Sequence, residues 1–196
     1  MNSNWVKAVL KATKVNYGSG LLLKGVPVIF NKRGSIIEIG DNVTIKSSFL
    51  SNLVGLYSRT IIVTRTSKAK IVIGNNVGIS GATIYAREGI SIGDNTLVGG
   101  NVKILDNDFH PLDPEARRND VKELINARPI SIGKDCFIGC NAIILKGTIL
   151  GDGCVVGAGA VVSGKFGNNC VVVGNPAHEI KASESVKKMT LHDTMG

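Results

Sequence analysis

An aliphatic residue recurs at every sixth position through much of this chain. In the clearest stretch these residues are Ile132, Ile138, Ile144, Leu150, Val156 and Val162. Shorter stretches with the same spacing begin at Ile39, Ile73 and Ile92. An α-helix would repeat at about 3.6 residues and a half-buried strand at about 2. A period of six therefore predicts short strands that are joined by regular, tight corners.

Two other positions of the repeat accept few residue types. The residue after the aliphatic one is often Gly, and the fourth residue after it is small or β-branched. The fourth residue fits an interior position near a corner, where a large side chain has no room. The glycines suit tight turns. Three hexapeptides, or about 18 residues, would make one triangular coil, and successive coils would pair as parallel strands about 4.8 Å apart. A Gly-rich β-sandwich with accidental periodicity is the alternative, and the long uninterrupted run disfavours it.

The four cysteines bear on the compartment and on metal binding. Cys136 and Cys154 occupy equivalent positions one coil apart, so we expect them to stack as small core residues without a disulfide or a metal. None of the cysteines forms a CxxC pair or has a His at zinc-ligand spacing. The start of the chain lacks the features of a signal peptide, and no apolar run reaches the roughly 20 residues of a membrane span. We therefore expect a cytoplasmic protein.

The net charge of +8 belongs to the first third of the chain. Residues 1–70 contain 11 Lys or Arg and 2 acidic residues, whereas residues 71–196 contain 12 and 13. A basic surface can face an anionic substrate, a membrane or a partner, or can simply be solvated. Residues 4–15 predict a short helix, which would either cap the first coil or contact a membrane surface peripherally. With no nucleic-acid-binding motif and only 5% aromatic residues, we expect no nucleic-acid partner.

Three segments resemble the hexapeptide-repeat acyltransferases, most closely the maltose, galactoside and polysaccharide O-acetyltransferase branch. They read GGNVKILDNDFHPLD, ARPISIGKDCFIGCNAIILKGTILGDGCVVGAGAVVSG and VVVGNPAHEIK. The resemblance implies an all-β fold, a left-handed parallel β-helix of hexapeptide repeats with a protruding catalytic loop and short terminal helices. That hand is an exception to the usual right-handed crossover. We predict a cap over residues 1–35, the β-helix domain over 36–181 and a tail over 182–196.

The repeat is interrupted in two places. Residues 46–70 are basic and out of register, so we predict irregular coils there. Residues 106–131 form a longer insertion that contains His110, at a position where an aliphatic core residue was due. A neutral imidazole can remove the proton of an attacking hydroxyl near neutral pH. Because the sequence DFHPLD stands where the family has its catalytic histidine, the resemblance implies that His110 is a general base. Asp108, Asp113 or a backbone carbonyl could orient the imidazole.

The resemblance also implies further site residues. Asn101 and Asp108 would contact the acceptor or the acyl group. The groove for coenzyme A would be lined by Cys140, Ala158, Ser163, Lys165 and Lys181. Two departures bear on this groove: Phe137 stands where the family often has Trp, and Gly164 stands where it often has Lys, so that Lys165 is one place late. Each lysine could equally be a solvated surface charge.

The resemblance implies an acetyl-CoA-dependent O-acetyltransferase that acts on a sugar or surface-polysaccharide hydroxyl, with acetyl-CoA as co-substrate and no metal. The resemblance implies a homotrimer with its active sites between subunits. N-acetylation of an aminosugar or amino acid on the same scaffold is the first alternative, and a non-enzymatic β-helix scaffold is the second. A zinc-dependent carbonic anhydrase would need three metal-binding histidines, and His110, His178 and His192 do not recur at coil spacing.

Overall fold

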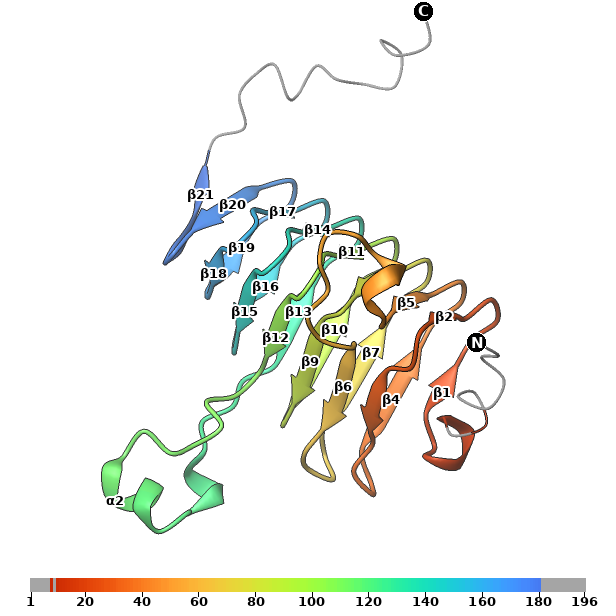
Figure 1. Cartoon of the computed structure of the whole chain (residues 1–196). Coiled ribbons are helices and arrows are strands. Elements are labelled where there is room, and N and C mark those ends of the chain that lie inside the picture. Colours follow the sequence, from red (N-terminus) through yellow and green to blue (C-terminus); the bar gives the residue numbers. More distant parts are fainter. Residues whose placement is uncertain (1–7, 9, 181–196) are drawn as a thin grey trace, which may run out of the picture.

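The computed structural model describes residue 8 and residues 10–180, which wind as a left-handed, three-sided parallel β-helix. Figure 1 shows the strands of successive coils side by side along the axis of the helix. Each coil adds one strand to each of three sheets, here named A, B and C. The predicted fold class is therefore confirmed.

The strands alternate between the sheets in chain order. Sheet A consists of β1 (Asn16–Tyr17), β4 (Ile36–Ile39), β7 (Lys70–Ile73), β10 (Gly89–Ile92), β13 (Ile130–Ile132), β16 (Ile149–Leu150) and β19 (Lys165–Phe166). Sheet B consists of β2 (Leu22–Lys24), β5 (Thr44–Lys46), β8 (Gly78–Ser80), β11 (Leu97–Val98), β14 (Phe137–Ile138), β17 (Val155–Val156), β20 (Val171–Gly174) and β21 (Ala177–Ile180). Sheet C consists of β3 (Val28–Phe30), β6 (Ile61–Thr64), β9 (Thr83–Ala86), β12 (Lys103–Leu105), β15 (Ile143–Leu145) and β18 (Val161–Val162).

The register of the strands explains the repeat of six. Ile132 pairs with Leu150, and Ile138 pairs with Val156, so equivalent residues of adjacent coils stack inside the helix. All six aliphatic positions of the clearest stretch are at most 2% exposed. Burying one such side chain stabilises a fold by about 1.5–3 kcal/mol. The stacked aliphatic residues therefore form one continuous core along the axis.

One corner of the coil is built by Asn and Asp residues with left-handed backbone. Asn42, Asn76, Asn95 and Asp135 have φ between 55° and 58°. Asn and Asp tolerate this region better than other residues with a side chain. Asn76 Nδ2 donates to Asn95 Oδ1 at 3.0 Å, and Asn95 Nδ2 donates to Asp135 Oδ1 at 2.9 Å. This polar ladder holds adjacent coils together at the corner between sheets A and B.

The structure corrects two boundaries. The β-helix begins at Asn16 rather than residue 36, because β1, β2 and β3 already pair with the second coil. Within residues 46–70, only residues 47–60 leave the wall, since β6 and β7 are regular strands of sheets C and A. An insertion before β6 and a longer turn after it shift this strand out of the six-residue register, which hid it in the sequence.

Helices are few and short. The structure has α2 (Pro114–Arg118) and the 3₁₀ turns η1 (Phe49–Ser51) and η2 (Lys122–Leu124), all in excursions from the coil. Residues 8 and 10–12 are helical, in agreement with the helix expected over 4–15. The part of the prediction that falls on residues 4–7, Val9 and the predicted tail 182–196 lie outside the described residues. Within the described part, no helix is long and apolar enough to span a bilayer.

The core cysteines are stacked thiols, as expected. Cys136 is 2% exposed, Cys154 is fully buried, and the Sγ atoms of Cys154 and Cys170 lie 3.1 Å apart. Burial raises the pKa of the Cys136 thiol, and it raises that of Cys170 to about 12. Over residues 8 and 10–180, no three His, Cys, Asp or Glu side chains are grouped so that they could hold a metal.

Candidate functional site

Two segments leave the coil at opposite edges of sheet C (Figure 1). The short loop, residues 47–60, connects β5 to β6 at the edge next to sheet B. The long loop, residues 106–129, connects β12 to β13 at the edge next to sheet A and carries α2. Both loops contact the coil that contains β12. The short loop packs at the N-terminal end of this strand, and the long loop begins at its C-terminal end.

The two ends of the long loop run side by side and are hydrogen-bonded to each other where the loop leaves sheet C. The Arg128 N–H donates to the Asp106 carbonyl at 2.9 Å, and the Asp108 N–H donates to the Asn126 carbonyl at 3.1 Å. Asn107 forms an antiparallel bridge with Ala127 between these two bonds. The loop therefore has a defined base, although its tip has no strand partner.

The carboxylate of Asp106 anchors this base to the preceding coil. It is fully buried and accepts hydrogen bonds from the backbone N–H groups of Arg87, Glu88 and Gly89 at 2.7–3.0 Å. The Asn107 side chain donates a further bond to it at 3.0 Å. Buried carboxylates need such compensation because they lose their hydration. Asp106 is a positioning residue that the sequence did not reveal.

A tight turn then presents His110. Phe109 has φ +63°, and the His110 N–H donates to the Asp108 carbonyl at 2.7 Å across it. A left-handed backbone is unusual for a bulky residue, and such turns are often found at functional sites. The Phe109 ring packs on Tyr85 with centroids 4.8 Å apart, and its N–H donates to Asn107 Oδ1. These contacts fix the backbone from which the imidazole projects.

The His110 side chain is exposed and borders a cavity of about 560 Å³. The cavity is lined by cations of separate turns, by the packed rings of Tyr85 and Phe109 and by other residues of the long loop. The lining residues are Lys32, Arg65, Tyr85, Arg87, Asn107, Phe109, His110, Asp120, Lys122 and Ile125. Within the described part of the chain, no side chain hydrogen-bonds to the imidazole. The imidazole is thus accessible to a substrate, and none of the described side chains orients it.

The acidic residues near His110 have other partners. Asp108 Oδ1 forms an ion pair with Lys146 Nζ at 2.5 Å, whereas its buried Oδ2 has no hydrogen-bond partner among the described residues. Asp113 is the N-cap of α2 and accepts from the Ala116 N–H at 2.8 Å. Capping residues of this type stabilise a helix start. The roles predicted for Asp108 and Asp113 beside the imidazole remain predictions.

Asn101 lies at the other end of β12 and secures the short loop. It is 4% exposed, its Oδ1 accepts from the Tyr57 N–H at 3.2 Å, and its Nδ2 donates to the Gly55 carbonyl at 2.9 Å. A Cβ at Gly100 would lie 2.6 Å from Val54 Cγ1, so glycine lets this loop pack closely. Both atoms of the Asn101 amide thus bond to the short loop, and its contact with a substrate remains a prediction.

Lys103 lies between the two loops on the outer face of sheet C. Its Nζ donates to Thr83 Oγ1 at 3.0 Å and lies 5.8 Å from the centre of the Tyr57 ring. Burial lowers the pKa of this ammonium group, because a desolvated cation is less favourable than the neutral amine. Lys103 was not among the predicted site residues, since its sequence context is that of any strand position.

The predicted coenzyme A residues fall into two groups. Cys140 and Ala158 stack at the corner between sheets B and C, where the Gly159 N–H donates to the Cys140 carbonyl at 2.9 Å. Ser163 and Lys165 are exposed beyond the other end of sheet C, because β18 lies between them and Ala158. Lys181 lies outside the described residues. Among the described residues, one chain therefore does not bring Cys140 and Ala158 together with Ser163 and Lys165.

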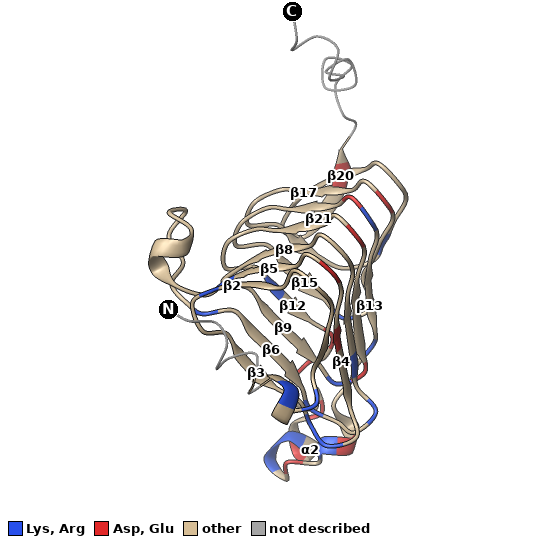
Figure 2. Cartoon of the chain, turned by 90° about the vertical axis from the view of Figure 1, so that its right-hand side faces the viewer, with Lys and Arg blue, Asp and Glu red and all other residues tan. Residues whose placement is uncertain are grey.

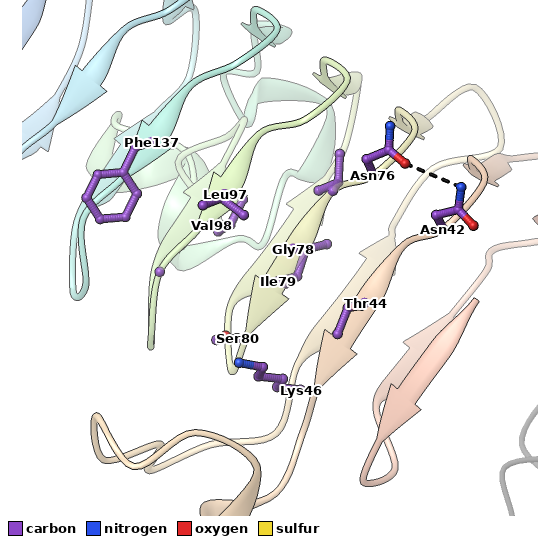
Figure 3. Close-up of a pocket in the computed structure, with 12 residues that line it drawn as sticks. Asn42, Thr44, Lys46, Asn76, Gly78, Ile79, Ser80, Leu97, Val98 and Phe137 are labelled. Atoms are coloured by element: carbon purple, nitrogen blue, oxygen red, sulfur yellow. Dashed lines mark hydrogen bonds between the residues drawn. The ribbon is translucent and has the colours of Figure 1, made fainter. Parts of the chain in front are cut away.

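A second hollow of about 390 Å³ lies on the outer face of sheet B. Figure 3 shows Thr44, Gly78, Leu97 and Phe137 along it, and the missing side chain at Gly78 deepens it. Leu97 and Phe137 are 53% and 49% exposed. Since His110 follows sheet C on the side of sheet A, this apolar face is separate from the histidine cavity.

Comparison with known proteins supports the sequence resemblance. A family model described as the hexapeptide repeat of succinyl-transferase matches residues 129–163. Galactoside O-acetyltransferase of Escherichia coli K12 is 36% identical over 92 residues, which cover 47% of this chain and 43% of that protein. A probable acetyltransferase of Mycobacterium tuberculosis is 30% identical over 165 residues, which cover 84% of this chain and 48% of that protein. The chain spans about half the length of the curated relatives it matches.

Among solved structures, AntD, an N-acyltransferase from Bacillus cereus, superposes over almost the whole chain. Its complex with dTDP and 3-hydroxybutyryl-CoA gives a TM-score of 0.69 at 24% identity, and the match covers 95% of this chain and 94% of that one. At this level of identity the likeness establishes the fold.

Proposed function

We propose that this chain is a hexapeptide-repeat acyltransferase and that it transfers an acetyl group from acetyl-CoA to a sugar hydroxyl. The observation that carries the proposal is His110, exposed at the mouth of a cavity on a tightly held turn. The other histidine in the described residues, His178, lies in the terminal hairpin β20–β21. Galactoside O-acetyltransferase, with its sugar acceptor, supports the choice of a sugar.

The chemistry needs one base and no covalent enzyme intermediate. A nitrogen of His110 takes the hydroxyl proton while the hydroxyl oxygen attacks the thioester carbonyl carbon. The new C–O bond forms, the C–S bond breaks, and the imidazolium returns the proton to the departing thiolate. Backbone N–H groups can stabilise the oxyanion that forms between these steps. No metal takes part in this scheme.

We propose that the acyl site is shared between copies of the chain, in a homotrimer. Cys140 and Ala158 lie at one edge of sheet C and His110 at the other, about 15 Å of extended chain apart. A second copy that places its own first edge against His110 would complete a groove between the two chains. The exposed apolar face of sheet B offers further surface for such packing.

N-acylation is the second candidate function. The structural match to AntD, an N-acyltransferase, extends over almost the full chain and supports it. An amine nucleophile would use the same base and the same groove. The two candidates therefore differ in the acceptor and not in the role of His110.

Release of free thiol from acetyl-CoA tests the proposed reaction directly. We expect thiol release to require both the protein and an acceptor. It should be faster with sugars that carry a hydroxyl at the acceptor position than with matched sugars that carry an amine there. Mass spectrometry of the product would locate the acetyl group on oxygen or nitrogen. A preference for the amine would favour N-acylation, and absence of acetyl-CoA binding in calorimetry would favour a non-enzymatic scaffold.

Mixing two inactive variants tests the shared site. His110→Ala removes the base, and Cys140→Trp fills the opposite wall of the groove. After unfolding and refolding together, we expect activity to return at about a quarter of the interfaces, since random assortment pairs an intact histidine with an intact wall there. Each variant refolded alone is the control. Mixtures as inactive as their parents would contradict a site shared between chains.

A further inference from the structure

A row of cations follows sheet C beside His110. Lys32 comes after β3, Arg65 after β6 and Arg87 after β9, so parallel stacking places them at one edge in successive coils. Lys122 of the long loop reaches the same cavity. In Figure 2, blue segments gather at the lower edge of the molecule, in the turns next to α2. We call this cavity, lined by these four residues and His110, the basic cavity.

Most of this charge is not neutralised within the described part of the chain. Over the described residues, Lys122 pairs with Asp120 at 3.2 Å, whereas Lys32, Arg65 and Arg87 have no carboxylate within 4.0 Å. The Arg87 guanidinium donates to the Lys122 carbonyl at 2.9 Å, which holds this side chain across the cavity. Three unpaired cations around one hollow create a positive potential that attracts an anion.

We propose that the basic cavity binds a phosphate or diphosphate group of the acceptor, which deepens the proposed function and rests on it. Arginine presents parallel N–H donors that match phosphate oxygens, and lysine adds a point charge. A cavity of about 560 Å³ is larger than a diphosphate, so it also has room for a sugar next to His110. A neutral sugar would bring no charge to balance Lys32, Arg65 and Arg87.

Calorimetry at low salt with pyrophosphate and UDP as probes tests this site. We expect both to bind, and Arg65→Ala and Lys32→Ala each to weaken binding about tenfold, because each removes a charged hydrogen-bond donor. Lys134→Ala is the matched control, because Lys134 is exposed and its only ion pair among residues 8 and 10–180 is with Asp94 at 4.0 Å. This variant should bind as the wild type does. Failure of the wild type to bind either probe, or unchanged binding by both cavity variants, would overturn the proposal.

A comparison of UDP with one further probe defines the source of the anion. UDP represents a soluble nucleotide, and farnesyl diphosphate in phosphatidylcholine vesicles represents a lipid-linked one. Tighter binding of either supports the site and identifies the form of the acceptor. Loss of UDP binding in saturating coenzyme A would instead assign the cavity to the phosphates of coenzyme A and overturn the acceptor site. Acetyl-CoA binding by the wild type, measured alone, tests the proposed reaction separately from the anion site.

Discussion

Replacing His110 by alanine is expected to lower kcat/KM for acetyl transfer by about 10²–10⁴-fold, the usual contribution of a general base. The imidazole is exposed and has no hydrogen-bond partner among the described residues, so its removal leaves the contacts of the long loop intact. Exposed substitutions of this kind change stability by about 0.5 kcal/mol or less. The loss should therefore appear in thiol release and not in the urea midpoint.

His178→Ala provides the matched control for this experiment. His178 is also exposed, but it lies on β21 in the terminal hairpin, far along the helix axis from the long loop. We expect this variant to keep wild-type kcat/KM. If His110→Ala retained nearly full turnover, or if both variants lost activity equally, His110 would not be the base.

The fold could be predicted because the same buried position inside the coil recurs many times along the sequence. Ile132, Ile138 and Ile144 each fill the same kind of position inside a coil, so one physical constraint repeats along the sequence. The first coil and strand β6 escaped detection because an insertion or a longer turn displaces them from that register. A six-residue repeat predicts regular coils, but it does not predict the structure of the loops that interrupt them.

The site was harder to predict because its supports lie between coils. Asp106 acts through backbone N–H groups of the preceding coil, and any residue can supply such a group. Asn101 bonds to a loop that lies more than 40 positions earlier in the chain. The basic cavity combines cations from separate turns, which look like scattered surface charges in the sequence. His110 itself was identified by family resemblance, since the broken repeat alone marks only a loop.

Asp106→Asn is expected to destabilise the protein by about 3 kcal/mol, because charged hydrogen bonds contribute about 1.5–3 kcal/mol each and stranded N–H groups add to the loss. The asparagine amide keeps one acceptor oxygen and directs an NH₂ group toward the donors of Arg87, Glu88 and Gly89. Urea unfolding at fixed protein concentration measures the change, since assembly would otherwise shift it. Hydrogen exchange should also quicken at these three amides.

The same substitution should reduce acetyl transfer without removing a catalytic group, because Asp106 holds the base of the loop that presents His110. Asp120→Asn is the matched control, as Asp120 is exposed and its only ion pair among the described residues is with Lys122. We expect this control to change stability by about 0.5 kcal/mol or less. If Asp106→Asn were equally mild, the buried carboxylate would not anchor the loop, and the position of His110 would have to depend on the Phe109 turn alone.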